Sequence, residues 1–256
     1  MQIFWKENHN TKQVILGLNG QQANEEHPLV QVWLTAAPNL RAGFFIEDQQ
    51  ALLQCQSRIS LVDHGLQRPA WICTLVHGQG RAGEQPCSVY KKGFSLAWIT
   101  LSDKGAQGQR QDTSGPSILK FLQDRLDLSY TQGVVLADEP MLLKATLVDL
   151  CLTQKFDLVF TTGGTGVGPR DITPQVTASL VDLRLQGFEQ AMTLASMAKT
   201  PHGMISRAVA GTLGSSIVVN LPGSPKAVQE NLEAIFPALE HSVRKLQGDT
   251  TDCGRK

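Results

Sequence analysis

A glycine-rich loop between a strand pattern and a helix pattern constrains the fold of this 256-residue chain more than any other feature. The run 157–160 has strand character, the loop 161–171 holds four glycines within six residues, and a helical pattern opens at Ile172. Glycine permits positive φ and close approach of a ligand to the backbone, and amides beside a helix N-terminus favour phosphate. The loop lacks the lysine of a P-loop and the glycine spacing of a dinucleotide-binding loop. It therefore predicts either a phosphate-binding loop of another kind or a tight turn whose glycines serve packing.

After residue 92 the sequence alternates between apolar runs of strand type and helical patterns. The run 94–101 is apolar enough for a strand buried on both faces of a parallel sheet, and apolar residues in 226–246 recur at helical spacing. The alternation predicts an α/β fold with a mostly parallel sheet and helices on both faces. Strands are expected at 94–101, 133–137, 156–161, 207–212 and 216–220, and helices at 116–126, 140–150, 173–183, 187–198 and 226–246.

Residues 1–92 have a different character. Short β-type runs separated by turn formers predict a small, mainly β N-terminal domain. A linker is expected within 78–86 and 91–93, followed by the α/β domain at 93–247 and a C-terminal tail at 248–256. The first 92 residues carry eight Lys and Arg against seven Asp and Glu, so their charge indicates no partner.

The composition is that of an ordinary globular protein with a packed core, since 41% of the residues are hydrophobic and 18% are charged. Lys and Arg number 23, as do Asp and Glu, so no net charge attracts nucleic acid or an anionic membrane. The sequence has no apolar run long enough to cross a membrane, and its start lacks the apolar core of a signal peptide, which predicts a cytoplasmic protein.

The five cysteines have irregular spacing and form no CxxC pair. This pattern argues against a disulfide framework and a four-cysteine zinc site, and it favours reduced thiols. Cys73 and His77, with Cys55, His64 and Cys87 nearby, are candidates for a metal site that their irregular spacing disfavours. The six histidines form no HExxH motif and suggest no hydrolase triad.

Polar loops follow four of the expected strands, at 102–103, 138–139, 161–171 and 220–225. Ligands of α/β proteins bind outside the carboxyl ends of parallel strands, so these loops predict one site. Carboxylates and phosphate repel each other unless a cation lies between them, and Mg²⁺ is the usual bridge. A structural role remains open for each of Asp112, Asp138 and Asp171, because aspartate is favoured at helix N-caps. Arg170 and Arg207 could each face either a ligand or solvent.

Residues from about 96 to 246 resemble the molybdenum cofactor biosynthesis family of MogA, MoaB and the gephyrin G domain. The resemblance rests on several motifs in order, at 102–105, 108, 112–116, 137–139, 161–166, 170–174, 206–207 and 220–225. It implies an α/β domain that transfers AMP from Mg-ATP to the terminal phosphate of molybdopterin and releases pyrophosphate. It also implies a homotrimer and delivery of the product to a molybdenum-insertion protein.

The resemblance assigns roles to residues that match the motifs of the family. Asp138 and Asp171 would be the catalytic or Mg²⁺-binding carboxylates, and Asp112 a third acidic residue of the site. Phosphate would bind at Thr162, Gly163, Gly164, Thr165 and Gly166, and the ligand pocket would be lined by Ser102, Asp103, Ser224 and Pro225.

The sequence departs from the family at 186–193, where Thr193 replaces a common arginine. This change leaves open a second hypothesis, in which the chain is a molybdopterin-binding scaffold without catalysis and its N-terminal domain binds a partner protein. A pterin-independent nucleotide hydrolase on the same fold is a third possibility, without a positive signal. A companion domain of the MOSC type would suit residues 1–92, but no motif supports it.

Overall fold

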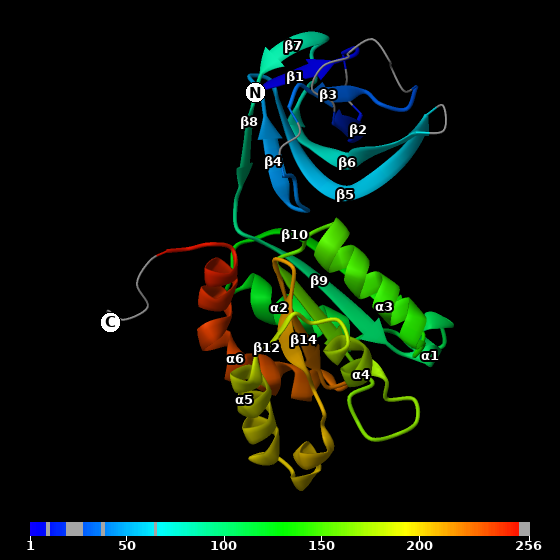
Figure 1. Cartoon of the computed structure of the whole chain (residues 1–256), viewed down its shortest axis with the longest axis vertical. Helices are drawn as coiled ribbons and strands as arrows, with labels where there is room; N and C mark the ends of the chain where they lie inside the picture. The colour runs from blue at the N-terminus through cyan, green and yellow to red at the C-terminus, as the bar shows by residue number, and fades with distance from the viewer. Residues whose placement is uncertain (9–10, 19–27, 37–38, 64–65, 251–256) are drawn as a thin grey trace. The chain divides into compact units, whose positions relative to one another are not determined.

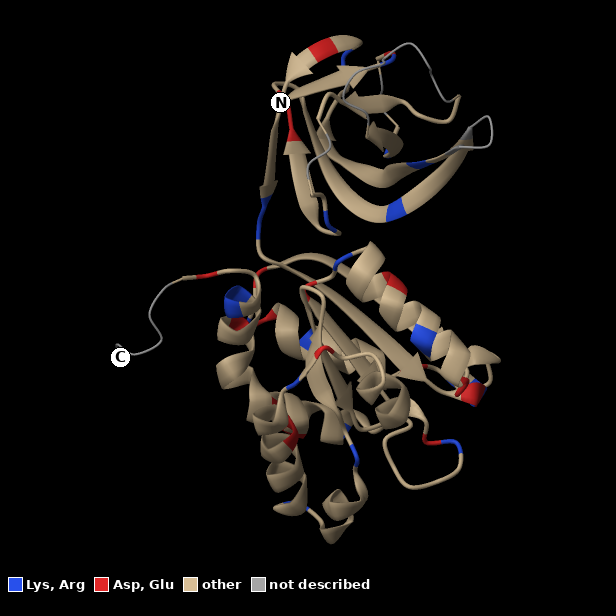
Figure 2. Ribbon diagram, viewed as in Figure 1, with Lys and Arg blue, Asp and Glu red and all other residues tan. Residues whose placement is uncertain are grey.

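The computed structural model describes residues 1–8, 11–18, 28–36, 39–63 and 66–250. The chain divides into two compact units, Met1–Phe94 and Ser95–Lys256 (Figure 1). Lys and Arg are interspersed with Asp and Glu over the ribbon of both units (Figure 2), in agreement with the equal numbers of the two charges. Within the described part of the chain, no helix is long and apolar enough to cross a membrane. The C-terminal tail expected at 248–256 lies largely outside the described residues.

The first unit is an eight-stranded sheet in the order β7-β1-β3-β2-β6-β5-β4-β8. Its strands are β1 (Gln2–Trp5), β2 (Gln13–Leu18), β3 (Val32–Leu34), β4 (Phe44–Glu47), β5 (Ala51–Asp63), β6 (Leu66–Gly78), β7 (Gly83–Pro86) and β8 (Ser88–Lys91). Most neighbours are antiparallel, and β2 and β3 are parallel. The stretch 78–86, which the sequence suggests as a linker, instead contains β7, and β7 pairs with β1.

A compact apolar core stabilises this unit. Trp5 and Trp71 are among its largest buried side chains, and the indole N–H of Trp5 donates to Asp48 Oδ2 over 2.8 Å. Cys55 and Cys73 face each other across β5 and β6 as buried free thiols, with their sulfur atoms 3.8 Å apart. Among the described residues no three His, Cys, Asp or Glu side chains form a metal site, and His64 lies outside them. The reduced thiols predicted from the sequence are therefore accommodated as core residues.

The second unit has a six-stranded mixed sheet in the order β10-β9-β11-β14-β13-β12. Its strands are β9 (Phe94–Leu101), β10 (Leu128–Leu136), β11 (Leu158–Thr162), β12 (Leu183–Arg184), β13 (Ala210–Leu213) and β14 (Ser216–Leu221). The central strands β9, β11 and β14 are parallel. β13 pairs antiparallel with β14, and β12 pairs antiparallel with β13 at the edge of the sheet. β11 and β14 are fully buried, as the continuous apolar pattern predicts.

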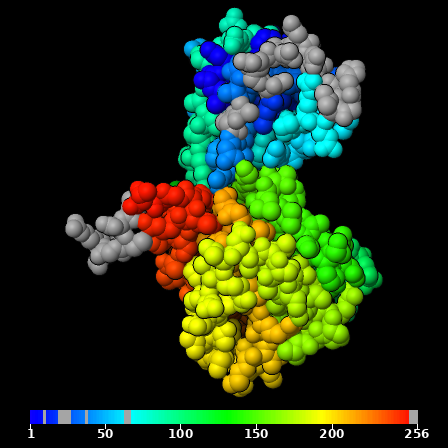
Figure 3. Space-filling view, in the orientation of Figure 1, coloured from blue at the N-terminus to red at the C-terminus, as the bar shows by residue number. Residues whose placement is uncertain are grey.

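Helices cover both faces of this sheet, which confirms the predicted α/β fold (Figure 1). They are α1 (Asp103–Ala106), α2 (Ser114–Gln123), α3 (Pro140–Val148), α4 (Thr173–Ala178), α5 (Gln186–Met197) and α6 (Pro225–Leu246), with a π turn η1 (Asp149–Thr153) and a 3-10 turn η2 (Pro201–Ile205). α6 packs on α2 and α5, whereas α3 packs on α4. The atoms of α5, coloured yellow, lie at the surface in Figure 3.

Two expected helices differ in detail from the observed ones. α4 ends at Ala178 instead of continuing to Leu183, because Leu183 and Arg184 pair with β13 as a short strand. In α5, Met192 is buried in the core, whereas Met197 near the end of the helix is 39% exposed. Pairing with a strand about thirty residues away thus overrides the local helical pattern.

Candidate active site

The three parallel strands end in register, so the loops that follow them leave the sheet at one edge. Thr162 at the end of β11 pairs with Thr100 of β9 and with Leu221 of β14. The loop that begins at Ser102, the glycine loop and the turn at Pro222 therefore meet, as the sequence predicts for the carboxyl ends of parallel strands.

The glycine loop requires glycine at its first two glycine positions. Gly163 and Gly164 have φ of +97° and +62°. A Cβ on Gly163 would lie 2.6 Å from the carbonyl oxygen of Leu101, and a Cβ on Gly164 would lie 2.6 Å from Thr173 Oγ1. The Thr173 hydroxyl donates to Gly163 O over 2.9 Å. Packing thus explains these two glycines, and the same packing fixes the backbone path of the loop.

Arg207 holds the far half of the loop. Its Nε donates to Gly166 O over 2.7 Å, its Nη2 donates to Asp171 O over 2.8 Å, and its backbone N–H donates to Thr165 O over 2.9 Å. The sequence left open whether Arg207 faces a ligand or solvent, and the structure shows that its guanidinium bonds to main-chain carbonyls. One side chain therefore sets the positions of both ends of the segment 166–171.

Asp103 and Asp138 form a reciprocal pair between the loops after β9 and β10. The amide of Asp103 donates to Asp138 Oδ2 over 3.3 Å, and the amide of Asp138 donates to Asp103 Oδ1 over 3.0 Å. Asp138 Oδ1 lies 3.7 Å from the position of a Cβ on Gly164. The structure thus brings this predicted carboxylate against the glycine loop.

The two aspartates have opposite pKa shifts. Hydrogen bonding from the Asp138 amide and then from Arg170 lowers the pKa of Asp103. Burial raises the pKa of Asp138, the charges of Asp103 and Asp171 raise it further, and the Asp103 amide and Arg170 oppose this. Asp138 is thus a carboxyl group whose negative charge is incompletely compensated, and a cation nearby would favour its ionised form.

Asp171 is held within its own loop. Its Oδ2 accepts from the amide of Gly168 over 2.7 Å, and a Cβ on Gly166 would lie 2.8 Å from that oxygen. Asp171 does not cap α4, whose N-cap is Ile172, and Asp138 does not cap α3, whose N-cap is Glu139. The cap interpretation that remained open for these two aspartates is therefore not what the structure shows.

Asp112, in contrast, has the structural role that the sequence left open. Its Oδ1 accepts from the amides of Ser114 and Gly115, each over 3.0 Å, and its Oδ2 accepts from the Thr100 hydroxyl over 2.8 Å. It thus satisfies the first amides of α2 and ties that helix to β9. The same carboxylate also lines the cavity described next.

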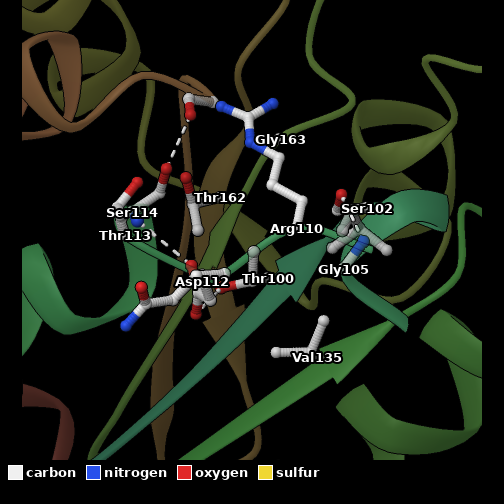
Figure 4. A pocket seen from close by; sticks show the side chains of 13 residues that line it. Thr100, Ser102, Gly105, Arg110, Asp112, Thr113, Ser114, Val135, Thr162 and Gly163 are labelled. Carbon is white, nitrogen blue, oxygen red and sulfur yellow. Dashed lines mark hydrogen bonds between the residues drawn. The ribbon is translucent and has the colours of Figure 1, made fainter. Parts of the chain in front are cut away.

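A cavity of about 150 Å³ opens between β9, α2 and the glycine loop (Figure 4). Its lining includes the predicted residues Ser102, Asp112, Thr162 and Gly163. Sequence reasoning missed the lining residues Thr100 and Arg110, whereas Ser114 and Gly223 belong to the motifs 112–116 and 220–225 but were given no role of their own. The Ser114 hydroxyl donates to Gly223 O over 2.6 Å, a contact across 109 positions that local sequence patterns cannot reveal.

A second cavity of about 220 Å³ lies on the other side of the loop, against α5, η2 and the start of α6. Its lining includes Thr165 and Gly166, whereas Thr162 and Gly163 line the first cavity. The glycine loop is thus a wall shared by two cavities. His202 is exposed and lines this second cavity.

Ser224 and Pro225, predicted as pocket residues, form the start of α6 and line neither of these cavities. The Ser224 hydroxyl oxygen accepts from the Ala227 amide over 3.2 Å, and Pro225 is the first residue of the helix. Thr193, where the family commonly has arginine, donates its hydroxyl hydrogen bond to Glu189 O over 2.8 Å within α5.

Comparisons with known proteins agree with this arrangement. A family model described as a probable molybdopterin binding domain matches residues 97–241. The molybdopterin adenylyltransferase of Helicobacter pylori strain J99 is 37% identical over 160 residues, which are 62% of this chain and 90% of that protein. Gephyrin of Dictyostelium discoideum is 36% identical over 153 residues, which cover 57% of this chain and 21% of gephyrin.

Solved structures give the same result. The molybdopterin biosynthesis enzyme MoaB of Thermus thermophilus is 39% identical, with a TM-score of 0.56 over 61% of this chain and 98% of that chain. The tungsten cofactor synthesizing protein MoaB of Pyrococcus furiosus is 32% identical, with a TM-score of 0.55 over 62% and 99% of the two chains. Because the family model covers more than half of the sequence, the chain belongs to the molybdopterin-binding family of MogA, MoaB and gephyrin.

Proposed function

We propose that this protein is a molybdopterin adenylyltransferase of molybdenum cofactor biosynthesis. It transfers AMP from Mg-ATP to the terminal phosphate of molybdopterin and releases pyrophosphate. The observation that carries the proposal is the position of Asp138 beside Gly164, with Asp103 and Asp171 close enough to influence its charge. The extent of the similarity supports it, because relatives named molybdopterin adenylyltransferase match over as much as 90% of their length.

The reaction joins a phosphate oxygen of molybdopterin to the α-phosphorus of ATP. The bond from that phosphorus to the bridging oxygen breaks, and pyrophosphate leaves with the electron pair. Such a transfer needs alignment and charge neutralisation more than a covalent nucleophile from the protein. The loop 163–166, braced by Arg207 and Thr173, supplies the alignment in our proposal.

Mg²⁺ enters this proposal as part of the nucleotide substrate. The side chains at the strand ends offer carboxylate oxygens, which Mg²⁺ prefers, and because burial raises the pKa of Asp138, a cation nearby would favour its ionised form. Asp138 and Asp171 would hold the ion, with phosphate oxygens completing its shell. When bound, the ion neutralises charge on the transferring phosphate.

The two cavities on either side of the glycine loop suggest where the organic parts of the substrates lie. The reacting phosphates would lie at the loop, and the adenosine and pterin parts would each extend into one cavity. Mutation of residues that belong to one cavity only, such as Ser114 and Ile205, tests this arrangement by raising the KM of one substrate but not of the other.

The full-length chain, incubated with molybdopterin and α-labelled Mg-ATP, is expected to form a labelled AMP-pterin adduct and pyrophosphate. Asp138→Ala and Asp171→Ala should suppress transfer more than substrate binding. Asp124→Ala, at the exposed C-terminal end of α2, is the matched control and should behave as wild type. If both site variants turned over normally, the assignment of these carboxylates would be wrong.

A non-catalytic molybdopterin-binding scaffold is the alternative, and Thr193 in place of an arginine favours it. In that case the first unit would bind a partner protein. The same incubation separates the two proposals, since a scaffold would bind the pterin without producing the adduct or pyrophosphate.

We further propose that the protein works in the cytoplasm as a homotrimer that passes its product to a molybdenum-insertion protein. Exposed apolar side chains, including Met141, Leu194 and Met204, provide surface that association would bury. Sedimentation equilibrium should then give a mass about three times that of the 27.9 kDa chain. A monomeric mass at micromolar concentration would exclude the trimer.

A further inference from the structure

We propose that Arg170 exchanges partners when the nucleotide binds. In the ligand-free protein its guanidinium is the counter-ion of the strand-end carboxylates. When Mg-ATP enters, the charge of Mg²⁺ held by Asp138 and Asp171 would compensate these carboxylates, and Arg170 turns to the nucleotide phosphates. This inference rests on the proposed function and adds to it a phosphate-binding residue together with a reason why metal and nucleotide bind together.

The contacts of Arg170 join three loops of the site. Its Nη2 lies 2.6 Å from Asp103 Oδ2 and its Nη1 lies 3.5 Å from Glu139 Oε1. Arg170 belongs to the glycine loop, Asp103 follows β9 and Glu139 follows β10. The guanidinium therefore pairs with carboxylates that follow two separate strands, next to the predicted Mg²⁺ ligand Asp138.

Because these charged groups are exposed, Arg170 can leave its present partners at little cost in free energy. The side chain of Arg170 is 56% exposed, and those of Asp103 and Glu139 are 39% and 54% exposed. Ion pairs of this kind contribute little to stability, because water screens both charges. Arg207 differs, since it is partly buried and bonds to the main-chain carbonyls of Gly166 and Asp171. Arg207 thus fixes the loop, whereas Arg170 can change partners without disturbing it.

The charges of the site explain why an exchange is favoured. Asp103, Glu139 and Asp138 all raise the pKa of Arg170, with the hydrogen bond to Asp103 as the largest cause. Mg²⁺ carries two positive charges and would compensate these carboxylates more fully than one guanidinium does. A triphosphate entering beside the loop then offers Arg170 oxygens that match its planar fork of donors.

Direct binding measurements on the full-length protein test the proposal, with Arg170→Gln as the variant. Mn²⁺ serves as the probe ion, and its binding without nucleotide is followed by electron paramagnetic resonance. We expect Mn²⁺ to bind about thirtyfold more tightly to the variant, as when one unit charge about 4 Å from a doubly charged ion of the same sign is removed in a water-like dielectric. Mg-ATP should bind about tenfold more weakly, because a charge-assisted hydrogen bond to phosphate is lost.

Arg244→Gln is a matched control. Arg244 is also 56% exposed and also pairs with a carboxylate, that of Glu240, but it lies about 28 Å along α6 from Pro225. This variant has the same net charge as Arg170→Gln and should bind both ligands as wild type does. Arg170→Lys, which keeps the charge but lacks the fork, should fall between wild type and Arg170→Gln in its affinity for Mg-ATP.

The outcomes separate this inference from the proposed function. If wild type neither binds Mg-ATP nor forms the adduct, the proposed function fails and the inference fails with it. If wild type is active while Arg170→Gln binds Mg-ATP, or Mn²⁺ alone, with wild-type affinity, the exchange is refuted and the adenylyltransferase proposal is untouched. The contacts with Asp103 and Glu139 would then be ordinary surface ion pairs.

Discussion

Replacement of Gly163 by alanine is the sharpest test of the glycine loop. With φ of +97°, a residue that has a Cβ is strained by about 1–3 kcal/mol. The new Cβ would also lie 2.6 Å from Leu101 O, about 0.8 Å short of the 3.4 Å at which ordinary contacts begin. Because Leu101 ends a central strand of the sheet, its carbonyl cannot move freely. We expect the second unit to lose about 2–4 kcal/mol of unfolding free energy.

The Gly163→Ala substitution should also impair catalysis. If the loop moves instead of Leu101, its amides shift by nearly 1 Å, and a misplacement of that size can reduce kcat about a hundredfold. Hydrogen exchange of the β9 and β11 amides measures the stability of the second unit, since a chain of two units need not unfold in one transition. The adduct-forming assay measures kcat in the same samples.

Gly187→Ala is the control for this experiment. Gly187 lies near the start of α5, and a Cβ there would meet nothing within 4 Å. This variant should be as active as wild type and more stable by about 0.4–1 kcal/mol, because alanine restricts the unfolded chain. If Gly163→Ala matched wild type within about 0.5 kcal/mol and in kcat, the role given to the loop geometry would be refuted.

Three further predictions concern charge and packing. Asp138→Asn should raise the unfolding free energy at pH 7, because burial raises the pKa of Asp138 and the folded state therefore disfavours its charge. In denaturant titrations this gain in unfolding free energy should shrink as the pH falls towards 3.8, the ordinary pKa of aspartate. A gain that does not depend on pH would contradict this cause. Arg207→Gln leaves loop carbonyls without their donor and should reduce kcat about a hundredfold, whereas unchanged turnover would show that the loop holds its shape alone. Cys73 and Cys151 should react with a thiol reagent only after unfolding, because both are buried. Burial also raises the pKa of each thiol, that of Cys151 to about 12. Labelling of either cysteine in the native protein, detected by mass spectrometry, would contradict this prediction.

The α/β fold could be predicted because its strands and helices have local signals. The apolar run at 94–101, the helical spacing at 226–246 and the glycines of 163–168 each carry a signal within a few residues. Parallel strands then force their following loops to one edge, which is why Asp138 could be expected beside Gly164 from the sequence.

The errors arose where distant pairing decides local structure. Residues 83–86 look like a linker, yet they form β7 because β1 offers an edge for pairing. Leu183 and Arg184 leave the helical pattern because β13 binds them. Thr100 and Arg110, which the sequence did not single out, line the first cavity together with residues from segments far apart in the chain.

The sequence by itself determined the main strands and helices of the α/β unit, the glycine loop and the edge of the sheet where polar residues gather, because period and backbone freedom are local properties. Only the tertiary structure decided which polar side chain does what. It directs Asp112 to the start of α2 and Arg207 to loop carbonyls, and it pairs Arg170 with Asp103. A polar side chain bonds to the groups that lie within hydrogen-bond distance, and the folded chain sets those distances.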